Sequence, residues 1–255
     1  MSDPVRLVRD GRRATLTLGR PPLNILDLEM IAALDARLIE LAGDDEIQLV
    51  VLRGAGEKAF SAGVSVGDHV GEKVPAMLAG FHGAIRRLRK LPATTLAVVD
   101  GACLGGGMEL ALVCDLVLAT DRARFGQPEI RLGCYPPVAA ALYPSRLGHG
   151  RTMELLLTGR PLDAEEAERL GLVTWRVAHD QLDARLGELA DELTRPSAAV
   201  ARLTKRAVLA GGDCPFEAAL AIAERLYLDE LAETDDMREG IAAFLEKRSP
   251  VWRHR

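Results

Sequence analysis

Val98-Val99-Asp100-Gly101-Ala102-Cys103-Leu104-Gly105-Gly106-Gly107-Met108-Glu109-Leu110-Ala111-Leu112 joins an apolar run to a helical pattern through three consecutive glycines. The run that leads into it, Thr94-Thr95-Leu96-Ala97-Val98-Val99, is short and rich in β-branched residues, which predicts a buried strand. The segment from Met108 to Cys114 contains neither glycine nor proline and predicts a helix. The sequence therefore predicts a strand-to-helix junction with the three glycines at the turn.

This junction has the features of a site for an anion, or for an oxygen that becomes anionic during a reaction. Glycine costs conformational entropy at a helix start, so a run of three indicates that the backbone approaches another group closely. The first N–H groups of a helix have no internal partners and lie at the positive end of its dipole. Glu109 lies just inside the helix, and a carboxylate beside such a site predicts acid–base chemistry next to a carbonyl. The alternative is a tight turn with Glu109 in solvent.

The composition limits the class of protein. The 255 residues are 48% hydrophobic and 27% charged, which is typical of a globular chain, and the aromatic content of 4% predicts an aliphatic core. A net charge of −5 argues against a general nucleic-acid binder. The first residues carry charge where a signal peptide needs an apolar region, and the longest apolar run, 110–119, is too short to span a bilayer. We expect a cytoplasmic protein with no membrane or nucleic-acid partner.

The cysteines and histidines give no metal pattern. Cys103, Cys114, Cys134 and Cys214 have neither CxxC spacing nor a histidine at ligand spacing, so we expect small buried side chains and no metal site. The basic run Arg86-Arg87-Leu88-Arg89-Lys90 predicts a solvated helix end, with RNA binding as the alternative.

Short strands alternate with helices over the first two-thirds of the chain, which predicts an α/β fold with parallel pairing. Strands are expected at 5–9, 14–18, 47–52, 94–99, 114–119 and 173–177, and helices from an Asp27 cap to 42 and at 76–91, 108–114, 137–147, 151–158 and 163–170. From residue 179 the pattern is almost wholly helical. We therefore divide the chain into a core that carries the active site, 1–195, and a helical region for oligomerisation, 196–255.

Four motifs follow one another along the chain: Phe60-Ser61-Ala62-Gly63-Val64, Leu104-Gly105-Gly106-Gly107-Met108-Glu109, Gln127-Pro128-Glu129, and Gly240 with Phe244-Leu245-Glu246-Lys247-Arg248. Their order and spacing resemble the crotonase (enoyl-CoA hydratase/isomerase) superfamily over nearly the whole chain. The resemblance implies a spiral of ββα units with a helical C-terminal region, assembled as a homotrimer or a dimer of trimers. It also implies an acyl-CoA thioester substrate, with coenzyme A as part of the substrate and no metal or redox cofactor.

The resemblance also implies roles for individual residues. The oxyanion hole maps to the backbone N–H groups of Val64 and Gly106, and the two catalytic glutamates of the hydratases map to Glu109 and Glu129. Many relatives with other reactions lack one or both glutamates, so the pair favours addition of water to a conjugated C=C. We assign Glu109 to water and Glu129 to proton transfer with the acyl carbon, although the sequence leaves this division open. Binding of CoA and substrate maps to Leu23, Ala62, Val66, Tyr135, Phe244 and Lys247, and the last two can come from a neighbouring subunit.

Two loops depart from common hydratases. Ser65 stands where they have Asp, and Tyr135-Pro136-Pro137-Val138-Ala139-Ala140-Ala141 replaces a glycine-rich loop, so the acyl pocket should be stiffer and differently shaped. Both loops resemble the cyclohexa-1,5-diene-1-carbonyl-CoA hydratases of aromatic-acid degradation. The alternatives are a generic enoyl-CoA hydratase/isomerase of fatty-acid oxidation and, in a different class, an RNA-binding or catalytically silent CoA-binding homologue. A role for His69, which follows the first loop, stays open.

Overall fold

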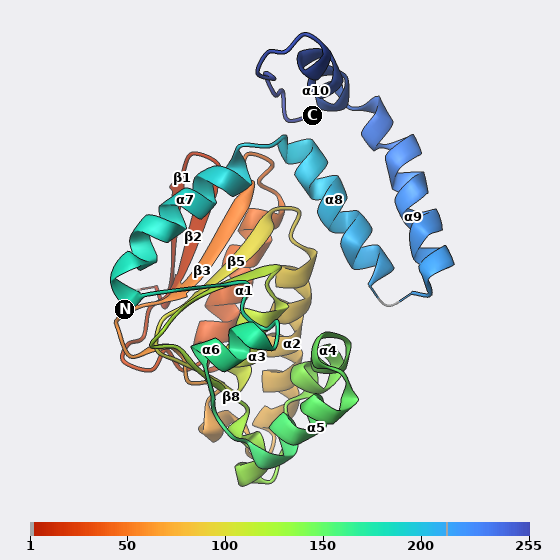
Figure 1. The fold of residues 1–255 in the computed structure, drawn as a ribbon. Helices are drawn as coiled ribbons and strands as arrows, with labels where there is room; N and C mark the ends of the chain where they lie inside the picture. Colours follow the sequence, from red (N-terminus) through yellow and green to blue (C-terminus); the bar gives the residue numbers. More distant parts are fainter. Residues whose placement is uncertain (1–2, 213) are drawn as a thin grey trace.

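A six-stranded sheet forms the centre of the fold in the computed structural model, which describes residues 3–212 and 214–255. The hairpin of β1 (Val5–Asp10) and β2 (Arg13–Leu18) lies at one edge, as predicted. The other strands run parallel to β2 in the order β3 (Leu49–Gly54), β5 (Thr94–Val99), β7 (Leu116–Thr120) and β10 (Trp175–Val177) (Figure 1). The predicted α/β class with parallel pairing is confirmed.

A second, smaller sheet holds short strands in the order β4 (Ala59–Ser61), β6 (Ala102–Leu104), β8 (Arg124–Gly126) and β9 (Leu162–Asp163). Each of three successive units gives one strand to the large sheet, one to the small sheet and then a helix. The helices of these units are α2 (Lys73–Lys90), α3 (Gly106–Val113) and α4 (Pro137–Leu147). This repeated ββα order places the end of each short strand on the same side of the molecule, where the glycine junction lies.

Helices cover both faces of the large sheet. Val50 and Leu52 of β3 belong to the core cluster that includes α1 (Leu28–Ala42), α2 and α3, whereas Leu49 and Val51 pack in a separate cluster with α7 (Leu182–Thr194). This alternation is what a strand buried on both faces requires. The Asp27 side chain accepts a hydrogen bond from the N–H of Met30 and caps α1, as predicted.

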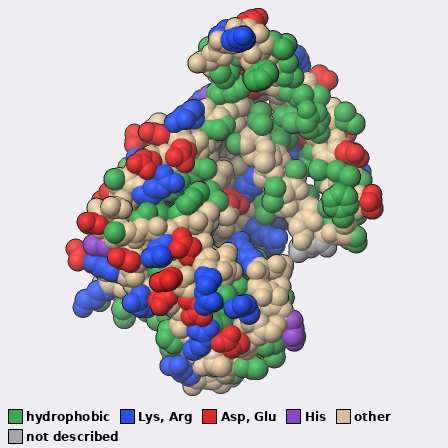
Figure 2. Space-filling view, viewed as in Figure 1, with side chains coloured by type: hydrophobic (Ala, Val, Ile, Leu, Met, Phe, Trp, Pro, Cys, Tyr) green, Lys and Arg blue, Asp and Glu red, His purple; other side chains and the backbone are tan. Residues whose placement is uncertain are grey.

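Three further helices form a C-terminal arm, which we define as residues 198–255: α8 (Ala198–Gly211), α9 (Phe216–Asp229) and α10 (Asp235–Leu245). Figure 1 shows the arm standing away from the sheets. Lys205 attaches α8 to the core through Asp115, at 2.7 Å, and the carbonyl oxygen of Ala93, at 2.9 Å. Apolar side chains gather on the visible face of the arm (Figure 2), and its exposed residues include Phe216, Leu228, Phe244, Leu245 and Val251.

Several local expectations are wrong. The helix after the glycines begins at Gly106 and not at Met108, so two of the three glycines lie inside its first turn. Cys103 and Cys114 are buried as expected, but Cys134 is half-buried and Cys214 is exposed. The two-residue strand β9 and the three-residue strand β6 were not expected, because such short segments carry no alternating pattern. Within the described residues, α5 (His149–Thr158) and α6 (Ala164–Arg169) complete the set of α-helices, and none is long and apolar enough to cross a bilayer.

Candidate active site

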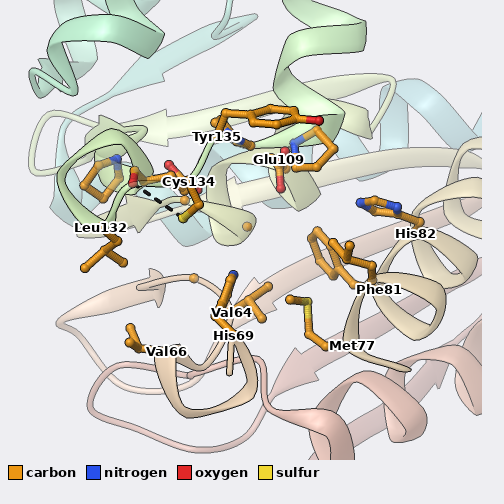
Figure 3. Close-up of a pocket in the computed structure, with 18 of the residues that line it drawn as sticks. Val64, Val66, His69, Met77, Phe81, His82, Glu109, Leu132, Cys134 and Tyr135 are labelled. Carbon is orange, nitrogen blue, oxygen red and sulfur yellow. Dashed lines mark hydrogen bonds between the residues drawn. The ribbon is translucent and has the colours of Figure 1, made fainter. Parts of the chain in front are cut away.

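A pocket opens where the loop after β4, the N-terminus of α3, one face of α2 and the loop before α4 meet. Figure 3 shows Val64, Met77 and Phe81 facing Glu109 and Tyr135 across this pocket. Three of the four motifs found in the sequence contribute to its lining, and both predicted catalytic glutamates are among the lining residues. The fold therefore brings together residues that lie up to 75 positions apart along the chain, from Ala62 to Pro137.

The backbone segments of the two predicted oxyanion residues lie side by side. A Cβ atom placed on Gly106 would come within 3.3 Å of the Val64 nitrogen. Leu26 pairs with this segment by donating to the carbonyl of Gly63 and accepting from the N–H of Ser65, which leaves the Val64 N–H outside the pairing. Gly106 is the first residue of α3, so its N–H has no acceptor within the helix. In the described part of the chain, no other backbone acceptor for either N–H is found.

Close packing explains why three glycines stand in a row. A Cβ on Gly107 would come within 2.5 Å of the Ser61 carbonyl oxygen, and one on Gly106 would come within 2.6 Å of a methyl group of Val64. Gly105 has φ of +53°, and its Cβ would lie 2.8 Å from a carboxylate oxygen of Glu129. Each glycine therefore allows a different approach: to β4, to the oxyanion segment and to the second glutamate.

Glu109 is buried, with a relative exposure of 3%, and its carboxylate lies at the N-terminus of α4. One of its oxygens accepts a hydrogen bond of 2.8 Å from the N–H of Ala139, in the first turn of that helix. Burial raises the pKa of Glu109 to about 7; the charge of Glu129 adds to this, while the N–H groups of Ala139 and Val138 oppose it. A carboxyl group with this pKa can both accept and release a proton near neutral pH.

Glu129 lies in the 3₁₀ helix η2 (Pro128–Leu132) and is half-buried at the pocket. Burial raises its pKa, whereas its own backbone N–H and the nearby His69 lower it. The imidazole Nδ1 of His69 lies 2.9 Å from the carbonyl oxygen of Ser65, which holds the ring at the mouth of the pocket. The pocket thus contains two carboxyl groups whose environments both favour the protonated form to different degrees.

Three of the six predicted binding residues line the pocket, and they come from two walls that face each other (Figure 3). Ala62, Val66 and Tyr135 line it, and Val66 and Tyr135 are 60% and 67% exposed, which leaves them free to contact a ligand. Leu23 does not line the pocket, but its carbonyl oxygen accepts a hydrogen bond of 2.9 Å from the N–H of Ala62. Leu23, whose side chain is exposed, therefore lies next to the loop 62–64 that carries the predicted oxyanion residue Val64.

Phe244 and Lys247 are the exceptions. Phe244 lies in the last turn of α10 and Lys247 lies two residues beyond its end, and neither lines the pocket of its own chain. In Figure 1 the helix α10 is at the top of the molecule, whereas the pocket-forming helix α4 lies in its lower half. Any contact of these two residues with a ligand in a pocket like this one would have to come from another subunit.

The wall that α2 forms was not evident from the sequence. Met77 and Phe81, both buried, and the half-buried His82 face the glutamates from this helix. The spacing of Met77 and Phe81 indicated one face of a helix, but it could not show which cavity that face borders. Among the residues that the structure describes, no group of three His, Cys, Asp or Glu side chains is placed to hold a metal ion.

Comparison with known sequences adds to this geometry. A sequence model of the enoyl-CoA hydratase/isomerase family matches residues 12–255. The cyclohexa-1,5-dienecarbonyl-CoA hydratase of Thauera aromatica is 39% identical over 256 residues, covering 100% of this chain and 98% of that protein. A short-chain-enoyl-CoA hydratase of Clostridium acetobutylicum is 34% identical, covering 96% of this chain and 95% of that protein.

Solved structures agree with the sequence matches. The crystal structure of an enoyl-CoA hydratase from Bacillus anthracis superposes with a TM-score of 0.93 at 29% identity, covering 99% of this chain and 100% of that chain. An enoyl-CoA hydratase/carnithine racemase from Magnetospirillum magneticum gives a TM-score of 0.90 at 33% identity, covering 100% and 97% of the two chains. The expected crotonase-like fold is confirmed.

Proposed function

The chain belongs to the enoyl-CoA hydratase/isomerase family as a carbon–oxygen lyase of the hydratase type, and we propose that it hydrates a cyclic dienoyl-CoA thioester. The observation that carries this proposal is the arrangement around one pocket: two adjacent backbone N–H groups without partners in the described chain, facing two carboxyl groups with raised pKa values. This set of groups is what addition of water to a conjugated thioester requires.

The N–H groups of Val64 and Gly106 receive the thioester oxygen. When hydroxide adds to the conjugated C=C, the electron pair of that bond moves toward the carbonyl and the oxygen becomes enolate-like. Donors that are already aimed at this oxygen stabilise the transition state by about 3–4 kcal/mol each. The positive end of the α3 dipole, which begins at Gly106, acts in the same direction.

The two glutamates exchange protons with water and carbon. Ionised Glu109 accepts a proton from water as the oxygen of that water bonds to the acyl chain. Protonated Glu129 delivers its proton to the carbon next to the thioester, which completes the addition. After one turnover Glu109 is protonated and Glu129 is ionised, so one proton must pass from the first to the second, directly or through solvent, before the next. A pKa of about 7 for Glu109 lies near the working pH of such a base.

The cyclic substrate is supported by the loop that closes the pocket. Pro136 and Pro137 begin α4, and Tyr135 stands beside them on the pocket, where a glycine-rich loop would leave more room and more freedom. This stiff wall suits a flat ring better than a flexible chain. The Thauera aromatica relative, by its name, acts on a cyclic diene. A generic enoyl-CoA hydratase is the second candidate, since other relatives carry that name.

The proposal includes the path of coenzyme A and the assembly. We place the pantetheine and nucleotide along Leu23, Ala62 and Val66, with Phe244 and Lys247 supplied by a second copy of the chain. The exposed apolar residues of the arm support a homotrimer or dimer of trimers, because surfaces of this kind are buried in stable assemblies. No metal or redox cofactor takes part in the proposed reaction, and a location in the cytoplasm fits an acyl-CoA substrate.

A side-by-side assay tests the proposal. The enzyme is given crotonyl-CoA and cyclohexa-1,5-diene-1-carbonyl-CoA, and the products are identified by mass and by NMR, which also gives the position of the hydroxyl group. We expect hydration of both, with kcat/KM higher for the cyclic diene. A preference for crotonyl-CoA would support the generic hydratase instead. Hydration of neither, together with tight CoA binding or salt-dependent RNA binding, would favour a homologue of a different class.

A further inference from the structure

Gln127 is a buried amide that lies next to the active site without lining the pocket. It follows β8, precedes η2 and has a relative exposure of 2%. Its amide group lies 2.5 Å from the hydroxyl group of Tyr143, which is fully buried in α4. On the other side, the same amide lies 3.1 Å from both carboxylate oxygens of Glu129 and 3.3 Å from the carbonyl oxygen of Gly105.

These neighbours determine which way the amide points. The three atoms on the Glu129 side are oxygens that accept hydrogen bonds, so the NH₂ group must face them. The amide oxygen then faces Tyr143 and accepts from its hydroxyl group. Burial raises the pKa of Tyr143 well above its ordinary value, so the hydroxyl stays protonated and remains a donor. Tyr143 therefore fixes the orientation of Gln127, and Gln127 donates to Glu129.

This contact matters because Glu129 has no other side-chain support in the described chain. The carboxyl group also interacts with the backbone N–H of Glu129 itself. Cys134 contacts only the Glu129 carbonyl oxygen: its Sγ lies 3.5 Å away (Figure 3), and its N–H donates to the same oxygen. The side chain of a glutamate on a short 3₁₀ turn samples several rotamers unless a partner stabilises one of them. Gln127 supplies that partner. It also donates to the carbonyl oxygen of Gly105, the residue just before the predicted oxyanion residue Gly106.

Helix α4 thus reaches both glutamates. Its first turn donates the Ala139 N–H to Glu109 at 2.8 Å, and its second turn carries Tyr143, which holds Gln127. The two supports come from one rigid element, so the carboxyl groups keep a fixed relation to each other. We propose that Gln127, oriented by Tyr143, is the positioning residue that aims the Glu129 carboxyl group at the acyl carbon.

This inference rests on the proposed function, in which Glu129 transfers a proton to carbon. A misplacement of about 1 Å in such a group can lower turnover by about 10²-fold without weakening binding of the rest of the substrate. Loss of Gln127 should therefore reduce kcat and leave KM for the CoA thioester unchanged. A residue that only stabilised the fold would change neither value once the protein is folded.

Four variants test this. Gln127→Met keeps the length of the side chain and removes its amide, but it leaves the Tyr143 hydroxyl group buried without a partner. The double variant Gln127→Met/Tyr143→Phe removes both polar groups, which should restore most of the lost stability. Gln48→Met is the matched control, since Gln48 is 1% exposed and donates to the backbone at Leu193 and Pro196, away from the pocket. Glu129→Gln reports on the proposed function itself.

The measurements are Tm, kcat and KM with crotonyl-CoA. We expect Gln127→Met and the double variant to lose about 10²-fold in kcat at unchanged KM, although the double variant regains its Tm. Gln48→Met should lower Tm and keep kcat. Recovery of kcat together with Tm in the double variant would overturn the positioning role while leaving the proposed function standing. Wild-type turnover in Glu129→Gln would instead overturn the proposed function and, with it, this inference.

Discussion

Every residue of α3, which carries Glu109, is buried against other parts of the same chain, whereas α9, on the arm, has no buried residue at all. The close approaches of Gly105, Gly106 and Gly107 to their neighbours leave no room for another side chain in the pocket wall. On the arm, Phe216 and Phe244 are 73% and 83% exposed. We therefore expect the residues of one chain to carry out the chemistry, and we expect a second copy to cover the apolar surface of the arm.

The strongest test of this contrast replaces one carboxyl oxygen in the pocket by an amide NH₂ group. Glu109→Gln or Glu129→Gln keeps the shape of the side chain and removes its acid–base function, so kcat should fall by about 10²- to 10⁴-fold. Binding of the CoA thioester should stay nearly intact, because neither carboxyl group is needed to hold the coenzyme. Stopped-flow kinetics and equilibrium binding of crotonyl-CoA check both values. Near-wild-type hydration in both variants would show that the pocket does not work in this way.

A glycine substitution tests how little space the pocket wall leaves. In Gly105→Ala, the new methyl group would come 2.8 Å from the Glu129 carboxylate, so we expect a loss of about 10²-fold in kcat. Gly11→Ala is the matched control, because Gly11 has φ of +56°, close to the +53° of Gly105, but has no atom within 4 Å of its Cβ. Gly11→Ala should lower stability by about 1 kcal/mol and leave kcat unchanged. Equal loss of kcat in both variants would count against the steric argument.

The pH dependence tests the burial of Glu109. Its pKa rises from 4.5 in the unfolded chain to about 7 in the folded protein. Protonated Glu109 therefore adds stability that is fully present below about pH 4.5 and is lost as the pH rises through 7. The loss is about 3 kcal/mol, since each pKa unit corresponds to about 1.4 kcal/mol. Urea unfolding should find Glu109→Gln more stable than the wild type at pH 8 and little different at pH 4.5.

Activity should change with pH in the opposite direction, because Glu109 acts as a base only when it is ionised. We expect kcat/KM to fall as the pH drops below about 7, and we expect Glu109→Gln to lose this acidic limb. An unchanged acidic limb in that variant would assign the titration to another group.

The smallest effect is expected on the arm. Phe244→Ala should raise KM for the CoA thioester about 3- to 10-fold at unchanged kcat, since the ring is proposed to contact coenzyme A in a neighbouring subunit. Phe216→Ala removes another exposed ring on the arm that has no proposed ligand contact, so it should leave KM unchanged. Sedimentation of both variants checks that the assembly is intact. A fall in kcat with no change in KM would show that Phe244 affects the reaction step and not the binding of coenzyme A, which would contradict the proposed division between arm and pocket.

The sequence predicted what local patterns determine. The β1–β2 hairpin, the Asp27 cap, β5 and the helix that begins at Pro137 all appear where the residues indicated them. It did not reveal β6 and β9, whose pairing depends on neighbours far away in the chain. Turn and cap residues act over a few positions, and that is why they can be recognised without the fold.

The same limit applies to the site. The glycine junction and the two glutamates could be identified from motifs, but the contact of Glu109 with the first turn of α4 joins residues thirty positions apart. Gln127 was visible only as part of a motif, since nothing in the sequence connects it to Tyr143. The exposure of Cys214 was missed for a related reason: cysteine is usually buried, and only the fold places this one on the arm.

A crystal structure with butyryl-CoA would show directly where the thioester oxygen binds, because this saturated thioester has no C=C to which water can add. We predict a thioester oxygen about 2.7–3.1 Å from the nitrogen atoms of both Val64 and Gly106, with the adjoining carbons facing Glu109 and Glu129. A thioester oxygen bound away from either nitrogen, or acyl carbons that face away from the two carboxyl groups, would contradict this prediction.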